Sequence, residues 1–113
     1  MERKSLGFVE VSGVVAAVDA LDIMCKSANV RLVTWERKLG GRLVTLVVTG
    51  EVAAVNSAVE NAVKLTIKKP VASLVLAAPH EETWKMVEFS AQRLKNREKG
   101  QVPHDEGYQE VNF

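Results

Sequence analysis

The spacing of apolar residues along the chain changes repeatedly between the period of a strand and the period of a helix. Residues 6–11 alternate from one position to the next, which predicts a strand that ends near Ser12 and Gly13. Residues 14–28 carry apolar side chains at helical spacing, so we predict an amphipathic helix with Ser12 as N-cap and Asn29 as its end. The apolar stripe of this helix consists of Val14, Ala17, Val18, Leu21, Cys25 and Ala28.

Two strands with a short connection follow this helix. The first runs from Val30 to Glu36, and strict alternation places Arg31, Val33 and Trp35 on one of its faces. The second runs from Leu43 to Thr49 and is rich in β-branched residues, which favour strands. Because the connection is short, we predict an antiparallel hairpin. Its loop consists of Leu39, Gly40, Gly41 and Arg42.

The helical period returns after Gly50 and stops before Pro70, since proline cannot continue a helix. The buried stripe expected for this second helix consists of Val52, Val55, Val59, Ala62 and Val63. Residues 71–78 then form an apolar run that fits a fourth strand. A third helix is expected from Glu81 to Leu94.

This order of elements, β-α-β-β-α-β followed by a terminal helix, predicts an α+β chain with the ferredoxin-like arrangement. We expect one domain over residues 1–80, a helix on or near it over residues 81–94, and a flexible polar tail over residues 95–113. Two helices cover only one face of a four-stranded sheet. Either the terminal helix or neighbouring subunits must therefore cover the other face.

Composition and charge exclude several classes of protein. The chain has 113 residues, with 15 basic and 14 acidic side chains, and this balance does not point to nucleic acid. A single cysteine excludes an internal disulfide framework and fits a reducing cytoplasm. We find no apolar run of roughly 18 residues that could span a membrane, and residues 1–5 lack the core of a signal peptide. We expect a cytoplasmic protein.

The sequence contains no convincing catalytic or metal-binding pattern. Cys25 lies on the apolar stripe, so we predict a packed core thiol rather than a nucleophile. His80 and His104 lack the spacing of metal ligands, and no catalytic triad, paired-carboxylate site or cofactor motif is present. We therefore predict no enzymatic activity, no metal and no cofactor.

The Gly40-Gly41 pair is open to two interpretations. On its own it is most simply a hairpin turn. However, Lys38 and Arg42 flank the glycine amide groups, and copies arranged around an axis would form a positive opening suited to anions or small polar molecules. Lys26, judged from composition alone, is a solvated lysine.

Several segments, in order and spacing, closely resemble the hexamer-forming shell proteins of bacterial microcompartments, which carry a BMC domain. The resemblance covers about residues 5–80. The matching segments are Leu6-Gly7-Phe8-Val9-Glu10-Val11-Ser12-Gly13, Ala16-Ala17-Val18-Asp19-Ala20, Lys26-Ser27-Ala28-Asn29-Val30-Arg31-Leu32-Val33 and Val44-Thr45-Leu46-Val47-Val48-Thr49-Gly50-Glu51-Val52-Ala53-Ala54-Val55.

This resemblance implies a structural role. Six subunits would form a flat ring, and rings would pack edge to edge, with other shell proteins, into a shell around enclosed enzymes in the cytoplasm. The pore loop would consist of Leu39, Gly40, Gly41 and Arg42, and it would pass small anions or polar metabolites. The edge between hexamers would involve Lys26, Asn29, Ala78, Pro79 and His80.

The sequence also departs from the family pattern. The loop that contains Gly40 and Gly41 carries one extra residue, and Ala78 replaces the arginine that precedes Pro-His. The segment after His80 is longer than in minimal members of the family. Residues 26–30 resemble the shell proteins of catabolic compartments more than those of carboxysomes. The alternative function is a small ferredoxin-like regulator that binds a ligand as a dimer or trimer.

Overall fold

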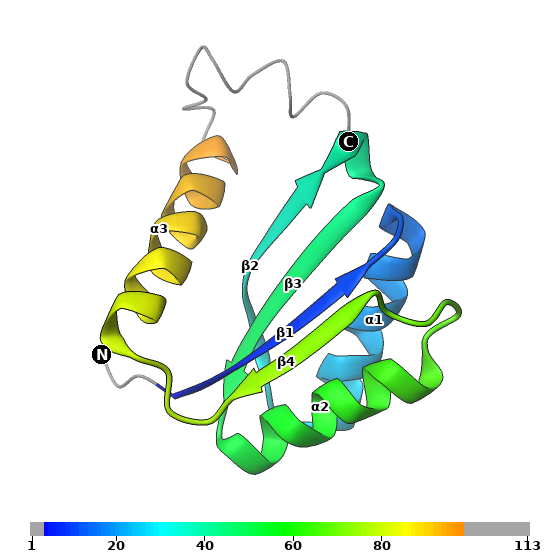
Figure 1. Ribbon diagram of the computed structural model, residues 1–113, viewed down its shortest axis with the longest axis horizontal. Helices are drawn as coiled ribbons and strands as arrows, with labels where there is room; N and C mark the ends of the chain where they lie inside the picture. The colour runs from blue at the N-terminus through cyan, green and yellow to red at the C-terminus, as the bar shows by residue number, and fades with distance from the viewer. Residues whose placement is uncertain (1–3, 99–113) are drawn as a thin grey trace.

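Four antiparallel strands form one sheet, in the order β2-β3-β1-β4, in the computed structural model, which describes residues 4–98 (Figure 1). The strands are β1 (Ser5–Val11), β2 (Arg31–Lys38), β3 (Leu43–Gly50) and β4 (Ala72–Leu76). The helices are α1 (Val14–Ser27), α2 (Val52–Leu65) and α3 (Glu81–Glu98), and a short 3-10 turn, η1, spans Leu39–Gly41. This arrangement confirms the predicted ferredoxin-like order with a terminal helix.

Helices α1 and α2 pack against one face of the sheet, where small apolar side chains form the main core (Figure 1). Close approach is possible because Gly7 on β1 has no side chain. A Cβ atom there would lie 2.8 Å from a methyl carbon of Val55 and 2.9 Å from one of Val59. The buried residues of the two helices are Ala16, Ala17, Ala20, Met24, Val55, Ala58, Val59 and Ala62.

The predicted stripe of α1 is wrong at two of its positions. Cys25 and Val18 are exposed, and Met24 is fully buried instead. Neighbouring residues on a helix point about 100° apart. The buried side of α1 is therefore centred slightly to one side of the predicted stripe, so that it includes Met24 and leaves out Cys25. The predicted N-cap is also wrong, because α1 follows Gly13 without a side-chain cap. The end of the helix agrees with the prediction: Ser27 is its last residue, Ala28 is the C-cap, and Asn29 comes directly after the cap.

A β-bulge in β2 corrects the predicted strand faces. The pairing between β2 and β3 shifts between Leu32 and Thr34, which leaves Val33 as an extra residue. As a result, Trp35 packs with Leu32 against the main core, whereas Val33 packs against the cluster below α3. The alternation that placed Trp35 on the face of Val33 therefore breaks at the bulge.

Helix α3 lies against the other face of the sheet, next to β2 (Figure 1). Its Trp84 and Val87 are buried with Leu6 and Val47 in a second, smaller apolar cluster. The terminal helix thus covers part of the second face, as one of the two sequence alternatives predicted. It extends past the predicted end at Leu94, and the rest of the predicted tail, 99–113, lies outside the described residues.

Polar side chains also join α3 to β2. Arg93 donates two hydrogen bonds of 3.0 Å to the carboxylate of Glu36, which also accepts a hydrogen bond from the Ser90 hydroxyl. The hydroxyl groups of Ser90 and Thr34 lie 2.9 Å apart. We call these four residues the α3 polar cluster. It holds the middle of the helix, whereas Trp84 holds its beginning.

Candidate functional site

The loop between β2 and β3 forms a tight left-handed turn at the end of the hairpin. The cross-strand pair Lys38–Leu43 closes the hairpin, and the turn η1 lies beyond it. Leu39, Gly40 and Gly41 have φ angles of 57°, 67° and 91°. Glycine adopts such angles freely, but a leucine in this region is strained by about 1–2 kcal/mol.

Three hydrogen bonds anchor this loop. The Gly13 amide donates to the Arg42 carbonyl at 3.0 Å, which ties the loop to the end of β1. The backbone N–H and the Nε–H of Arg42 both donate to the Leu39 carbonyl at 3.3 Å. Gly41 is buried, whereas Leu39 and Arg42 are exposed. The structure therefore brings the predicted loop residues together in one anchored turn with two cationic side chains, Lys38 and Arg42, beside it.

Two of the predicted edge residues lie at and after the end of α1. Lys26 is exposed and forms an ion pair of 2.8 Å with Asp22, one turn earlier on the same helix. The hydrogen bond and the charge of Asp22 raise the pKa of the Lys26 ammonium above its ordinary value. Asn29 is exposed in the connection to β2.

The other three predicted edge residues connect β4 to α3. Ala78 and His80 are exposed and Pro79 is half-buried. The Nδ1 atom of His80 accepts a hydrogen bond of 3.0 Å from the Glu82 amide, and the His80 carbonyl accepts one of 3.1 Å from the Trp84 amide. His80 therefore caps α3, a role that the sequence analysis missed. The acidic residues that follow it were the available signal for a helix N-terminus.

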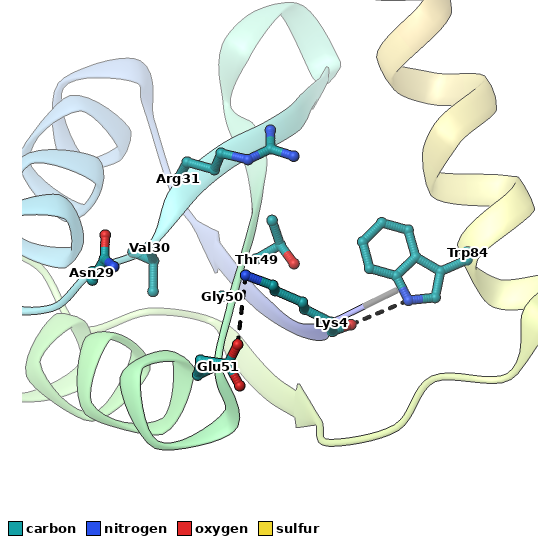
Figure 2. A pocket seen from close by; sticks show the side chains of 8 residues that line it. All are labelled: Lys4, Asn29, Val30, Arg31, Thr49, Gly50, Glu51 and Trp84. Atoms are coloured by element: carbon teal, nitrogen blue, oxygen red, sulfur yellow. Dashed lines mark hydrogen bonds and ion pairs between the residues drawn. The ribbon is translucent and has the colours of Figure 1, made fainter. Parts of the chain in front are cut away.

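A hollow of about 350 Å³ has Asn29, one of the predicted edge residues, in its lining (Figure 2). The Lys4 ammonium lies 3.5 Å from the Glu51 carboxylate, and the Trp84 indole N–H donates to the Lys4 carbonyl at 3.2 Å. Dashed lines mark both interactions in Figure 2. The hollow carries two cations and one carboxylate. Its lining consists of Lys4, Asn29, Val30, Arg31, Thr49, Gly50, Glu51 and Trp84.

Nothing in residues 4–98 resembles a metal site, because no three histidine, cysteine or acidic side chains converge there. Cys25 is exposed rather than packed in the core. Among the described helices, none is both long and apolar enough to cross a membrane.

Comparison with known proteins finds similar shell proteins, and the matched residues include the whole sheet. The BMC domain profile matches residues 5–79. The chain is 40% identical over 89 residues to the bacterial microcompartment shell protein PduA of Citrobacter freundii, covering 77% of this chain and 95% of PduA. It is 43% identical over 81 residues to the carboxysome shell protein CsoS1A of Hydrogenovibrio crunogenus, covering 69% of this chain and 83% of that protein.

A solved structure shares the fold. The crystal structure of a microcompartment protein from Desulfitobacterium hafniense superposes with a TM-score of 0.67 at 24% identity, over 79% of this chain. This chain spans 49% of that longer protein. The sheet order, the profile match and the identity to PduA agree, and the chain belongs to the BMC domain family of bacterial microcompartment shell proteins.

Proposed function

We propose that this protein is a shell subunit that forms cyclic hexamers, with the β2–β3 loops around a central pore. The observation that carries the proposal is the family match over residues 5–79, which includes the whole sheet and the loop at its tip. An anchored loop with exposed glycine and two neighbouring cations is suited to line a narrow opening.

An apolar surface supports association into a ring. Val15 and Val18 on α1 are exposed large apolar residues. Beside them lies an apolar hollow of about 190 Å³ between α1 and the strands β2 and β3. Contiguous exposed apolar surface is typical of protein–protein contacts. The lining residues of this hollow are Val14, Ala17, Val18, Leu21, Leu32, Trp35, Val44 and Leu46.

The proposed edge between hexamers has two parts on this chain. The first part consists of Lys26, in the last turn of α1, and Asn29, just after the helix. The second part lies in the connection from β4 to α3. The residues of that connection are Ala78, Pro79 and His80. An alanine cannot replace the planar donors of an arginine, so edge contacts would be weaker than in relatives that carry Arg-Pro-His. The variant Ala78→Arg should increase the yield of sheets seen by electron microscopy, and unchanged assembly would contradict this part of the proposal.

The pore would attract small anions and polar metabolites. Six copies of Arg42 near one axis would concentrate positive charge, which an anion such as sulfate or phosphate would relieve. In this proposal the protein has no catalytic activity of its own. Its partners are its own copies, other shell proteins and enclosed enzymes, and its location is the microcompartment shell in the cytoplasm.

The mass of the protein in solution, combined with negative-stain images at high concentration, tests this function. We expect a hexamer that assembles into sheets or tubes. A stable dimer that never forms larger assemblies would contradict a shell role, and it would favour the alternative of a small ligand-binding regulator.

A further inference from the structure

Leu39 is the first residue of the turn in the β2–β3 loop. It is 63% exposed, although leucine gains most from burial. Arg42 is also exposed, but its Nε–H donates to the Leu39 carbonyl, which draws the arginine side chain back along its own loop. The loop therefore presents an exposed apolar side chain, and its arginine is hydrogen-bonded to the backbone of the same loop.

The backbone conformation at Leu39 does not suit a leucine. Its φ angle of 57° lies in the left-handed region, where glycine and asparagine are far more common. Two glycines follow it, so the turn has residues that tolerate this region at the next positions. A strained and exposed leucine contributes little to the stability of the single subunit. Backbone strain of this kind clusters at functional sites.

We infer that Leu39 forms an apolar collar at the narrowest part of the pore, and that this collar favours neutral small molecules over ions. The inference rests on the hexameric ring proposed above. An ion must lose part of its hydration shell to pass an apolar constriction, whereas a neutral molecule with few polar groups loses less. Arg42 then attracts anions to the mouth of the pore, and Leu39 limits their passage.

The loop is held firmly enough to keep such a collar in place. Its carbonyl at Leu39 accepts two hydrogen bonds, and the Gly13 amide fixes the Arg42 carbonyl from the end of β1. Gly41 is buried against the body of the subunit. These contacts restrain the turn on both sides of the projecting side chain.

The variant Leu39→Asn tests the collar, because asparagine tolerates the left-handed region and is polar. The matched control is Leu65→Asn, at the end of α2, since Leu65 is also 63% exposed. Sheets of assembled hexamers are laid over a nanoporous support, and the fluxes of potassium chloride and of glycerol across them are measured. We expect Leu39→Asn to raise the salt flux about tenfold and the glycerol flux less than about twofold, with Leu65→Asn unchanged in both.

A second measurement does not depend on the pore. Leu39→Gly removes the left-handed strain, so its melting temperature should rise by about 2–5 °C. A fall in melting temperature would overturn the view that the leucine is held against its preference.

The outcomes separate the collar from the shell role. Intact Leu39→Asn hexamers with an unchanged salt flux would overturn the collar and leave the shell role standing. A wild-type protein that forms no ring, as judged by its mass in solution before sheets are assembled, would overturn both.

Discussion

The two faces of the sheet are covered in different ways. Helices α1 and α2 close one face with a broad apolar core that contains alanine, valine and the fully buried Met24. Helix α3 covers the other face with a small apolar cluster around Trp84, together with the α3 polar cluster. On that second face Leu74, Met86 and Phe89 are still exposed.

This difference suggests different roles for the two faces: the first specifies the fold, and the second modifies its local stability. The α1 and α2 face lies wholly within the region that matches the BMC domain, whereas α3 lies after it. A broad apolar core makes local opening expensive, and a helix held by few contacts opens more easily. We therefore expect the first face to determine global stability and the second to respond locally.

The largest effect is expected on the first face. Met24→Ala removes a fully buried side chain and should lower the free energy of unfolding by about 2–5 kcal/mol. Its neighbour Cys25 is exposed, so Cys25→Ala should change stability by less than about 0.5 kcal/mol. Denaturant unfolding of both variants measures the difference. Equal losses of stability in the two variants would contradict the burial of Met24 and the exposure of Cys25.

A smaller and more local effect is expected on the second face. Glu36→Gln weakens the charged hydrogen bonds to Arg93 and should cost about 1 kcal/mol, since both side chains are about one-third exposed. Hydrogen exchange should become faster in α3 and stay unchanged in α1 and α2. The control is Glu60→Gln, on the exposed face of α2. Equal protection of α3 in both variants would show that the polar cluster does not hold the helix.

The smallest effect is expected from the exposed ion pair on α1. Asp22→Asn should lower the pKa of Lys26, because Asp22 supplies both the hydrogen bond and the charge that raise it. A raised lysine pKa stabilises the fold at all pH values below the unfolded pKa, and this contribution disappears as the pH rises through the folded pKa. In the wild-type protein this contribution is therefore lost only in strongly alkaline solution, whereas Asp22→Asn removes it at lower pH as well. NMR titration of the Lys26 side chain checks the shift, and an unchanged pKa would mean that the pair does not persist in water.

The sequence predicted the features that local patterns encode. Changes of period identified every strand and helix of the ferredoxin-like order, and the Gly40-Gly41 pair identified the turn. The register within elements was harder to predict. A one-residue bulge at Val33 moved Trp35 to the other face, and a small rotation of α1 buried Met24 in place of Cys25.

Contacts between distant residues left no local signal. Glu36 and Arg93 are 57 positions apart, and neither lies in a pattern that indicates a partner. The cap formed by His80 and the left-handed conformation of Leu39 also depend on the fold around them. Leucine rarely adopts the left-handed conformation, so a leucine at position 39 predicts a different backbone from the one that is found.

The position of the β2–β3 loop in the assembled protein tests the central claim most directly. A cryo-electron microscopy reconstruction of the assemblies should show six subunits around one axis, with Leu39, Gly40, Gly41 and Arg42 of each subunit at the central opening. Rings in which these loops lie on the outer rim, or particles that contain only two subunits, would contradict the proposed shell pore.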